Sequence, residues 1–287
     1  MSYKFTITNW QSASLTFNEL GGAYTIKEIQ GLEPPVATIN TTKSALVDGG
    51  KYNSARAEMR TMNIAFAIEY EAEKHRLRAY QVLQVKKPVT IAYKSERVDA
   101  VIEGYVQAVK DTYFEAKQIM TATILCPSPW FRSAQEIIDS FTQITPLFHF
   151  PFESEEDPGE LIMGEIGQKT SLTVKNGGTV PTGMVVEIYA RGTVTNPKII
   201  DYTTNKYFEI GITTQSGDLI TIDTRDGYKK ADLLRGSTHT NIFNLITEGS
   251  SWLALDPGET TFVYTVTSGY TTSLQVTIYH NDLLEGV

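Results

Sequence analysis

Carboxylates bring this sequence nearest to catalysis, because a glycoside hydrolase needs only two of them at a fixed separation. Asp223 follows the apolar run 219–222 and precedes the turn sequence 224–227, which is typical of a strand that leaves a core. The other acidic candidates, which we interpret as solvated charge, are Glu136, Asp139 and the run 153–160. No pair is singled out by its surroundings, so the pattern favours structural carboxylates.

The four histidines, which could ligate a metal or transfer protons, stand in unrelated segments. They are His75, His149, His239 and His280, and no two have the spacing of metal ligands. We expect His75 on a charged, solvated helix face and His149 packed among aromatic residues. The sequence also lacks glycine-rich phosphate loops, a nucleophile elbow and an H-E-x-x-H pattern. We therefore predict no enzyme activity: no catalytic residue, no cofactor-binding residue, no metal site and no cofactor.

Aromatic residues of the second half could include a platform on which a sugar ring stacks. They are Tyr189, Tyr202, Tyr207, Phe208, Trp252, Tyr264, Tyr270 and Tyr279. Aromatic residues also favour strands and sandwich cores for their own sake, and Trp252 stands among apolar neighbours. The sequence favours core packing for Trp252 and leaves carbohydrate binding open as an alternative.

Length, charge and cysteine content bound the class of protein. At 287 residues the chain can hold two domains, each with its own core. Its net charge of -8 argues against a surface that grips nucleic acid, because phosphate binding needs clustered Lys and Arg. No apolar run has the length of a membrane span or of a signal peptide, so we expect no membrane insertion. The single cysteine, Cys126, lies in an apolar strand, and we expect it to be buried in a protein that folds in a cytosol.

Prolines divide the chain near its middle. The apolar strand 122–126 runs into Pro-Ser-Pro at 127–129, and two prolines so close fit neither a sheet nor a helix. Before them, short strands alternate with turns, and the polar, turn-rich segment 32–55 predicts an extended hairpin or loop that reaches away from the core. Helical spacing of apolar residues predicts one helix over 71–84. This half is typical of a small β-sandwich or split barrel that packs one helix.

The second half has a different rhythm. Strand candidates recur between turn signals, and residues 274–279 alternate apolar and polar side chains. This predicts a galectin-like or jelly-roll-like β-sandwich. The fold class is therefore all-β with one main helix, arranged as an N-terminal domain 1–131, a connecting segment 132–160 and a C-terminal sandwich 161–287.

Several segments, taken in order, resemble one protein family. In the first half these are the helix and strand of 76–93, Ile-Glu-Gly-Tyr-Val at 102–106 and Ile-Leu-Cys-Pro-Ser-Pro-Trp-Phe at 124–131. In the second half they are 196–205, 217–225, 252–259 and the final Gly286-Val287. Their order and spacing over nearly the whole chain are similar to the distal tail (Dit) family of long-tailed, siphovirus-type phages.

The resemblance implies a structural role. Members of the family form a hexameric ring at the distal end of the tail tube and link the tube to the baseplate or tip. Their N-terminal, tail-tube-like domains make the ring and line a channel through which DNA passes without specific binding. Their galectin-like C-terminal domains project outward, where host-binding components attach. The alternative is a carbohydrate-binding module that attaches to host cell-wall glycans.

The same resemblance implies partners and a location. The partners are other copies of the chain in a homo-hexamer, the tail tube protein, a tail-associated hub or lysin protein and receptor-binding proteins. The location is the virion tail tip, after assembly in the bacterial cytoplasm. Two features of the residues agree: an acidic chain suits a channel that DNA must slide through, and a long hairpin provides strands for pairing between subunits of a closed ring.

Overall fold

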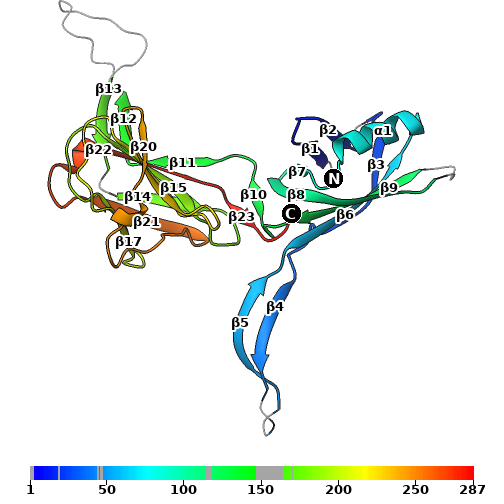
Figure 1. The fold of residues 1–287 in the computed structure, drawn as a ribbon, viewed down its shortest axis with the longest axis horizontal. Coiled ribbons are helices and arrows are strands. Elements are labelled where there is room, and N and C mark those ends of the chain that lie inside the picture. Colours follow the sequence, from blue (N-terminus) through cyan, green and yellow to red (C-terminus); the bar gives the residue numbers. More distant parts are fainter. Residues whose placement is uncertain are drawn as a thin grey trace, which may run out of the picture. The chain divides into compact units, whose positions relative to one another are not determined.

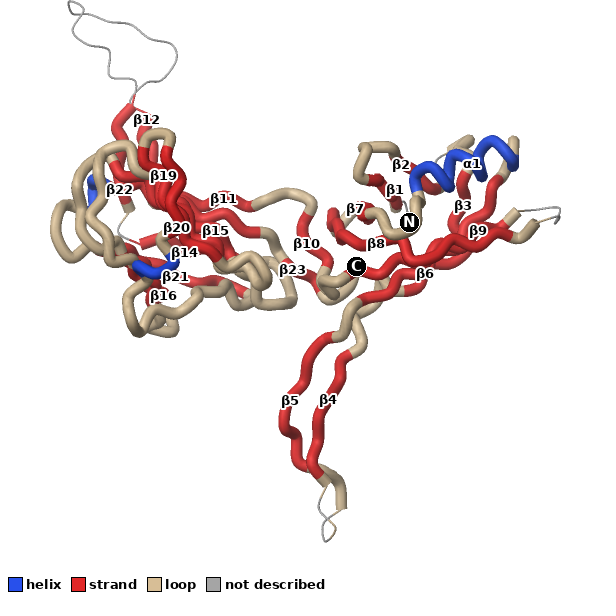
Figure 2. Tube along the Cα trace, viewed as in Figure 1, coloured by secondary structure: helices blue, strands red, loops and turns tan. Residues whose placement is uncertain are grey.

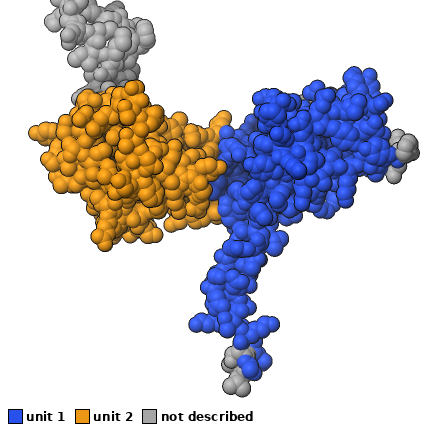
Figure 3. Space-filling model, viewed as in Figure 1, with its two compact units in different colours: residues 1–134, 283–287 blue, residues 135–282 orange. Residues whose placement is uncertain are grey.

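The chain folds into two units that are built almost entirely from β-strands, which confirms the predicted all-β class. The structure, a computed structural model, describes residues 3–18, 20–43, 45, 48–113, 118–146, 164–169 and 171–287. Unit 1 comprises residues 1–134 together with 283–287, and unit 2 comprises 135–282 (Figures 1 and 3). The division into an N-terminal domain 1–131, a connecting segment 132–160 and a C-terminal sandwich 161–287 stays a prediction. His149 and the acidic run 153–160 lie outside the described residues.

Unit 1 is organised around one antiparallel sheet. Its strands are β1 (Lys4–Asn9), β2 (Ser14–Phe17), β3 (Tyr24–Gln30), β6 (Arg60–Ile68), β7 (Pro88–Lys94), β8 (Asp99–Asp111), β9 (Ile119–Cys126), β10 (Phe131–Ser133) and β23 (Leu283–Leu284). The main path runs β2-β1-β7-β8-β9-β6-β3, and β10 pairs with both β8 and β23. β9 ends at Cys126, directly before the prolines, as predicted.

The two ends of this sheet meet at Asn18. The backbone N–H of Asn18 donates to the carbonyl of Tyr24 (3.0 Å), and the Asn18 side-chain oxygen accepts from the N–H of Ile26 (2.9 Å). β2 and β3, the strands at the two ends of the path, are thereby joined. The sheet is curled almost closed, as in a split barrel.

The interior of unit 1 follows from strand alternation. Inward-facing residues of β6 and β9 are fully buried, among them Phe66, Ile124 and Cys126, which is 0% exposed. Burial raises the pKa of the Cys126 thiol to about 11, so it is a packing residue, as expected. Helix α1 (Ala72–Val82) covers the sheet and buries Ala79 and Val82. It is shorter than the predicted 71–84. It begins after Glu71, which adopts a left-handed conformation (φ 44°), and it ends at Val82 because Leu83 leaves the helical conformation (φ -91°, ψ 54°).

The segment that was expected to reach away from the core forms a two-stranded ribbon. β4 (Ala37–Thr42) pairs with β5 (Lys51–Ala57) over their whole lengths, with a bulge between Asn40 and Thr41. Every residue of β4 is exposed. Figure 2 shows the ribbon standing apart from the sheet of its unit. The predicted extended hairpin is confirmed.

Unit 2 is a sandwich of two antiparallel sheets. One has the order β11-β22-β15-β18-β19-β20 and the other β14-β21-β16-β17, with β12 and β13 as a separate ribbon. The strands of the first sheet are β11 (Ile137–Ser140), β15 (Met184–Ala190), β18 (Leu219–Asp223), β19 (Lys230–Arg235), β20 (Thr238–Asn241) and β22 (Leu274–His280). Those of the second sheet and of the ribbon are β14 (Ser171–Asn176), β16 (Lys198–Asp201), β17 (Tyr207–Glu209), β21 (Gly258–Thr265), β12 (Thr142–Pro146) and β13 (Gly164–Gln168).

The buried residues of both sheets form one apolar cluster. β22 contributes Leu274, Val276 and Ile278, which alternate with half-buried residues as the sequence predicted. β21 contributes Phe262 from the facing sheet. Two single-turn 3-10 helices, η1 (Phe243–Leu245) and η2 (Thr271–Ser273), lie in the connections. Unit 2 thus completes its own core.

Candidate assembly surfaces

The β4–β5 hairpin separates apolar from polar side chains although it has no core of its own. Directly paired residues share a face of the ribbon. Three pairs form an apolar face, which we call the hairpin apolar face: Ala37 with Ala57, Ile39 with Ala55, and Thr41 with Tyr52. Ile39 and Tyr52 are each 62% exposed. Large apolar side chains thus line up on a surface that water reaches.

The opposite face of the hairpin is polar and internally bonded. Asn40 donates to the hydroxyl of Ser54 (3.0 Å), and Asn53 donates to the hydroxyl of Thr42 (2.7 Å). An isolated two-stranded ribbon is at best marginally stable in water. The side-chain bonds help to hold the strands together, but they leave the hairpin apolar face uncovered. Such a face is typical of a surface that another protein covers.

The base of the hairpin is fixed by a buried arginine. Arg60 is the first residue of β6, the strand that follows the hairpin, and is 3% exposed. Its guanidinium lies 4.7 Å from the centre of the Phe131 ring. It donates to four carbonyl oxygens, those of Gly31 (2.5 Å), Glu33 (2.6 Å), Pro129 (2.8 Å) and Glu285 (2.5 Å). We call this set the Arg60 node.

The Arg60 node joins segments that are far apart in sequence. Gly31 and Glu33 precede the hairpin, Pro129 belongs to the proline segment, and Glu285 follows unit 2. Burial lowers the pKa of Arg60, because the charged guanidinium has lost its hydration. The carbonyl dipoles replace that hydration. Sequence reasoning missed this residue, although Arg60, Met62, Ile64 and Phe66 follow the inward-facing alternation of a strand and could have marked it as buried.

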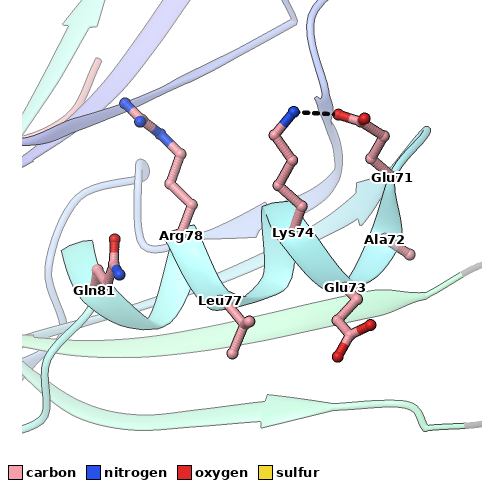
Figure 4. A pocket seen from close by; sticks show the side chains of 7 residues that line it. All are labelled: Glu71, Ala72, Glu73, Lys74, Leu77, Arg78 and Gln81. Carbon is pink, nitrogen blue, oxygen red and sulfur yellow. Dashed lines mark hydrogen bonds and ion pairs between the residues drawn. The ribbon is translucent and has the colours of Figure 1, made fainter.

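An open hollow of about 730 Å³ lies along α1. Figure 4 shows its lining, with Lys74 bonded to the Glu71 carboxylate at 2.6 Å. The lining residues are Glu71, Ala72, Glu73, Lys74, Leu77, Arg78 and Gln81. Leu77 is 52% exposed. Most of the lining side chains are charged or polar, which is typical of the solvated face of an amphipathic helix.

Asp223, the carboxylate weighed first for catalysis, lies in a structural pair, whereas Glu136 is exposed to solvent. Asp223 is 2% exposed, accepts from the backbone N–H of Arg225 (3.0 Å) and binds the Arg225 guanidinium through both oxygens. Asp218 is paired in the same way with Arg235, whose hydrogen bonds lower the pKa of Asp218. In the described part of the chain, no group of three or more His, Cys, Asp or Glu side chains could hold a metal ion.

Two expectations about solvated side chains are wrong. The His75 side chain is only 15% exposed, because its ring packs edge-on against Tyr24 and Tyr70 (centroids 5.6 and 5.1 Å). Asp139 is not freely solvated either, since its carboxylate lies 3.6 Å from Nε2 of the buried His280. The helical position of His75 was predicted correctly, whereas strand β11, which carries Asp139, was not predicted.

The aromatic residues of unit 2 divide between core and surface. Phe208 and Tyr264 are buried, and Trp252 packs against Phe208 at 5.0 Å between ring centres, which confirms the core interpretation of Trp252. Tyr189, Tyr202 and Tyr270 are exposed. They come from different strands and turns, and a sugar platform stays a prediction that titration with wall polysaccharide would check.

No helix in the described ranges has the length and apolar character that a membrane span requires. The longest, α1, has 11 residues.

Comparison with known proteins bears on both units. Residues 177–281 match the family model described as the siphovirus-type tail component, C-terminal domain. No curated protein sequence matches the chain. Among solved structures, the chain is similar to the Dit protein of phage SPP1, which is described as a paradigm of the hub adsorption apparatus in phages that infect Gram-positive bacteria.

That match has 16% sequence identity and a TM-score of 0.67, and it covers 97% of this chain and 98% of the other. Two structures of the phage P2 baseplate in its activated conformation, one with Ca and one with Sr, each match at 14% identity over the full length of both chains, with TM-scores of 0.52 and 0.51. The likeness in fold extends over both units. The match of residues 177–281 to the siphovirus-type tail component C-terminal domain and the likeness in fold to SPP1 Dit confirm the resemblance to distal tail proteins that the sequence predicted.

Proposed function

We propose that this chain is a structural, non-enzymatic component of a phage tail tip, a distal tail protein that links the tail tube to the host-adsorption apparatus. The family match over 177–281 and the likeness in fold to a hub protein and to baseplate chains support this proposal. The location that follows is the virion tail tip, reached after assembly in the bacterial cytoplasm.

In this proposal unit 1 forms a homo-hexameric ring, and the hairpin apolar face carries the argument. Ile39 and Tyr52 are exposed on a ribbon that cannot bury them by itself. In a closed ring each copy offers the hairpin to the next copy and receives one in turn, so all hairpins are covered. The ring-forming region is 1–131, and the connecting segment is 132–160.

The remaining roles divide between the channel and the periphery. The net charge of -8 suits a channel that lets DNA pass without specific binding. The C-terminal region 161–287 is a galectin-like sandwich that faces the adsorption apparatus. The partners are the tail tube protein, a tail-associated hub or lysin protein and receptor-binding proteins.

Native mass spectrometry and electron microscopy of the purified protein, alone and mixed with its tail tube protein, test the proposal. We expect six-fold rings with a central opening in at least one of the two samples. A protein that stays monomeric in both samples and does not bind the tube protein would contradict it.

A further inference from the structure

A short segment that follows unit 2 is built into unit 1. Residues 283–287, which we call the strap, belong to unit 1 although all of unit 2 precedes them in sequence. β23 pairs with β10, with Leu284 opposite Phe131. Leu284 and Val287 pack against the apolar core of unit 1. The strap therefore completes the core of unit 1, but it is synthesised after all of unit 2.

The strap is held by backbone groups and by a close fit. Arg60 donates to the carbonyl of Glu285 (2.5 Å), and the N–H of Val287 donates to the carbonyl of Leu32 (3.1 Å). A Cβ atom at Gly286 would lie 2.8 Å from that same Leu32 oxygen and 3.2 Å from Pro34. The site thus accepts an extended peptide with glycine at this position.

We infer that residues 31–34, Arg60 and 129–132 form a peptide-binding groove whose ligand is the strap, and that unit 1 completes its fold only after unit 2 has been synthesised and the strap has bound. The chain is made from the N-terminus, so the groove is empty while unit 2 is still being made. The consequence for assembly rests on the proposed function. The hairpin is firmly anchored for ring formation only after residues 283–287 have been synthesised and have bound.

The Arg60 node links the strap to the hairpin. The same guanidinium binds the carbonyls of Gly31 and Glu33, at the base of the hairpin, and the carbonyl of Glu285 in the strap. Without the strap, a buried charged donor loses one acceptor, and the edge of β10 that Leu283–Leu284 covers is left open. Both changes loosen the segment from which the hairpin extends.

Hydrogen exchange of the full chain and of a chain that ends at Asp282 tests the groove. We expect amides of 31–33 and 130–133 to exchange at least about tenfold faster without the strap, because local opening becomes easier. A synthetic peptide of residues 281–287 at millimolar concentration should restore protection, and a scrambled peptide should not. Equal exchange in the two chains, or equal rescue by both peptides, would overturn the inference.

Point variants decide the matter if the shortened chain is insoluble. Gly286→Ala introduces a Cβ into the tight contact with Leu32 and should speed exchange in 31–33. Gly50→Ala is the matched control, because a Cβ at Gly50 would come no closer than 3.4 Å to another atom. Equal exchange rates in the two variants would contradict the groove.

Proteolysis of ribosome-bound chains tests the order of folding. Chains stalled after residue 282 or 287, each followed by the same long linker, should differ in the protease resistance of residues 1–134. Resistance already present in the shorter chain would overturn the late completion of unit 1. These readouts do not depend on ring formation, so a monomeric full chain would refute the proposed function while exchange and proteolysis still decide the strap inference.

Discussion

The β4–β5 hairpin and strand β22 carry the same alternation of apolar and polar side chains, but only β22 buries its apolar half. In β22, Leu274, Val276 and Ile278 are at most 1% exposed, because the facing sheet of unit 2 covers them. In the hairpin, Ile39 and Tyr52 remain 62% exposed. The alternation of apolar and polar residues therefore identifies a strand face that packs against another surface. It does not show whether that surface belongs to the same chain or to another protein.

The largest expected effect on stability is that of an aspartate in β22, and the same residue type placed in the hairpin provides the comparison below. Val276→Asp places a charge in the core of unit 2 and should destabilise that unit by about 4 kcal/mol or more. Chemical denaturation followed by circular dichroism measures this effect. A change below about 1 kcal/mol would show that the β22 face is not a true core.

Arg60 tests how firmly the hairpin base is fixed. Arg60→Met keeps the bulk of the side chain but leaves four carbonyls without their donor, so unit 1 should lose about 3 kcal/mol. Lys94→Met is the control, because Lys94 pairs with Asp99 at the surface of unit 1 and outside the groove, where a pair contributes about 0.5 kcal/mol. Similar unfolding free energies for the two variants would contradict a stabilising role of the Arg60 node.

In the hairpin, Ile39→Asp should leave stability within about 0.5 kcal/mol of the original protein. It should weaken association between copies by about 30-fold or more, because a charge then lies at the centre of the contact. Analytical ultracentrifugation measures the association. Asn40→Asp, the next residue but on the polar face, should have a much smaller effect; equal losses in both variants would mean that the face does not matter.

Asp218 makes the stability of unit 2 depend on acid. The Arg235 hydrogen bonds lower the pKa of Asp218 below its value in the unfolded chain. This contribution is therefore complete above the unfolded pKa of about 4 and is lost as the pH falls through the folded pKa. Arg235→Gln should raise the pH at which acid unfolds unit 2, as followed by circular dichroism. An unchanged midpoint would exclude the pair as a source of acid stability.

The smallest expected effect is at Tyr80, which lies in α1. Burial, followed by its hydrogen bond to Tyr113 (3.1 Å) and the nearby charge of Asp111, raises the pKa of Tyr80 to about 12. The neutral phenol stabilises unit 1 below pH of about 10, and this contribution is lost as the pH rises toward the folded pKa. Because burial also raises the pKa of Tyr24, Tyr264 and Tyr279, ultraviolet titration should show several late tyrosines, with one fewer in Tyr80→Phe; an equal number in the two proteins would contradict the packing.

Patterns of single segments could be predicted from the sequence. The hairpin within 32–55, the helix near 71–84 and the end of β9 at the prolines all follow from turn residues and local spacing. So do the burial of Cys126 and the alternation of 274–279. Each depends on residues that are neighbours along the chain.

Contacts between distant segments could not be predicted. The Arg60 node needs four carbonyls from three separate segments. The strap pairs with β10 although all of unit 2 lies between them in sequence. His75 was expected in solvent because its helix neighbours are charged, whereas Tyr24 of the distant strand β3, together with Tyr70 just before α1, covers it. A sequence gives no distance between such residues.

A three-dimensional reconstruction of the assembled particle by electron microscopy tests the central claim most directly. The account predicts a six-fold ring in which the hairpin apolar face, with Ile39 and Tyr52, lies against the neighbouring copy. A ring whose subunits meet elsewhere, with Ile39 and Tyr52 left in solvent, would contradict it.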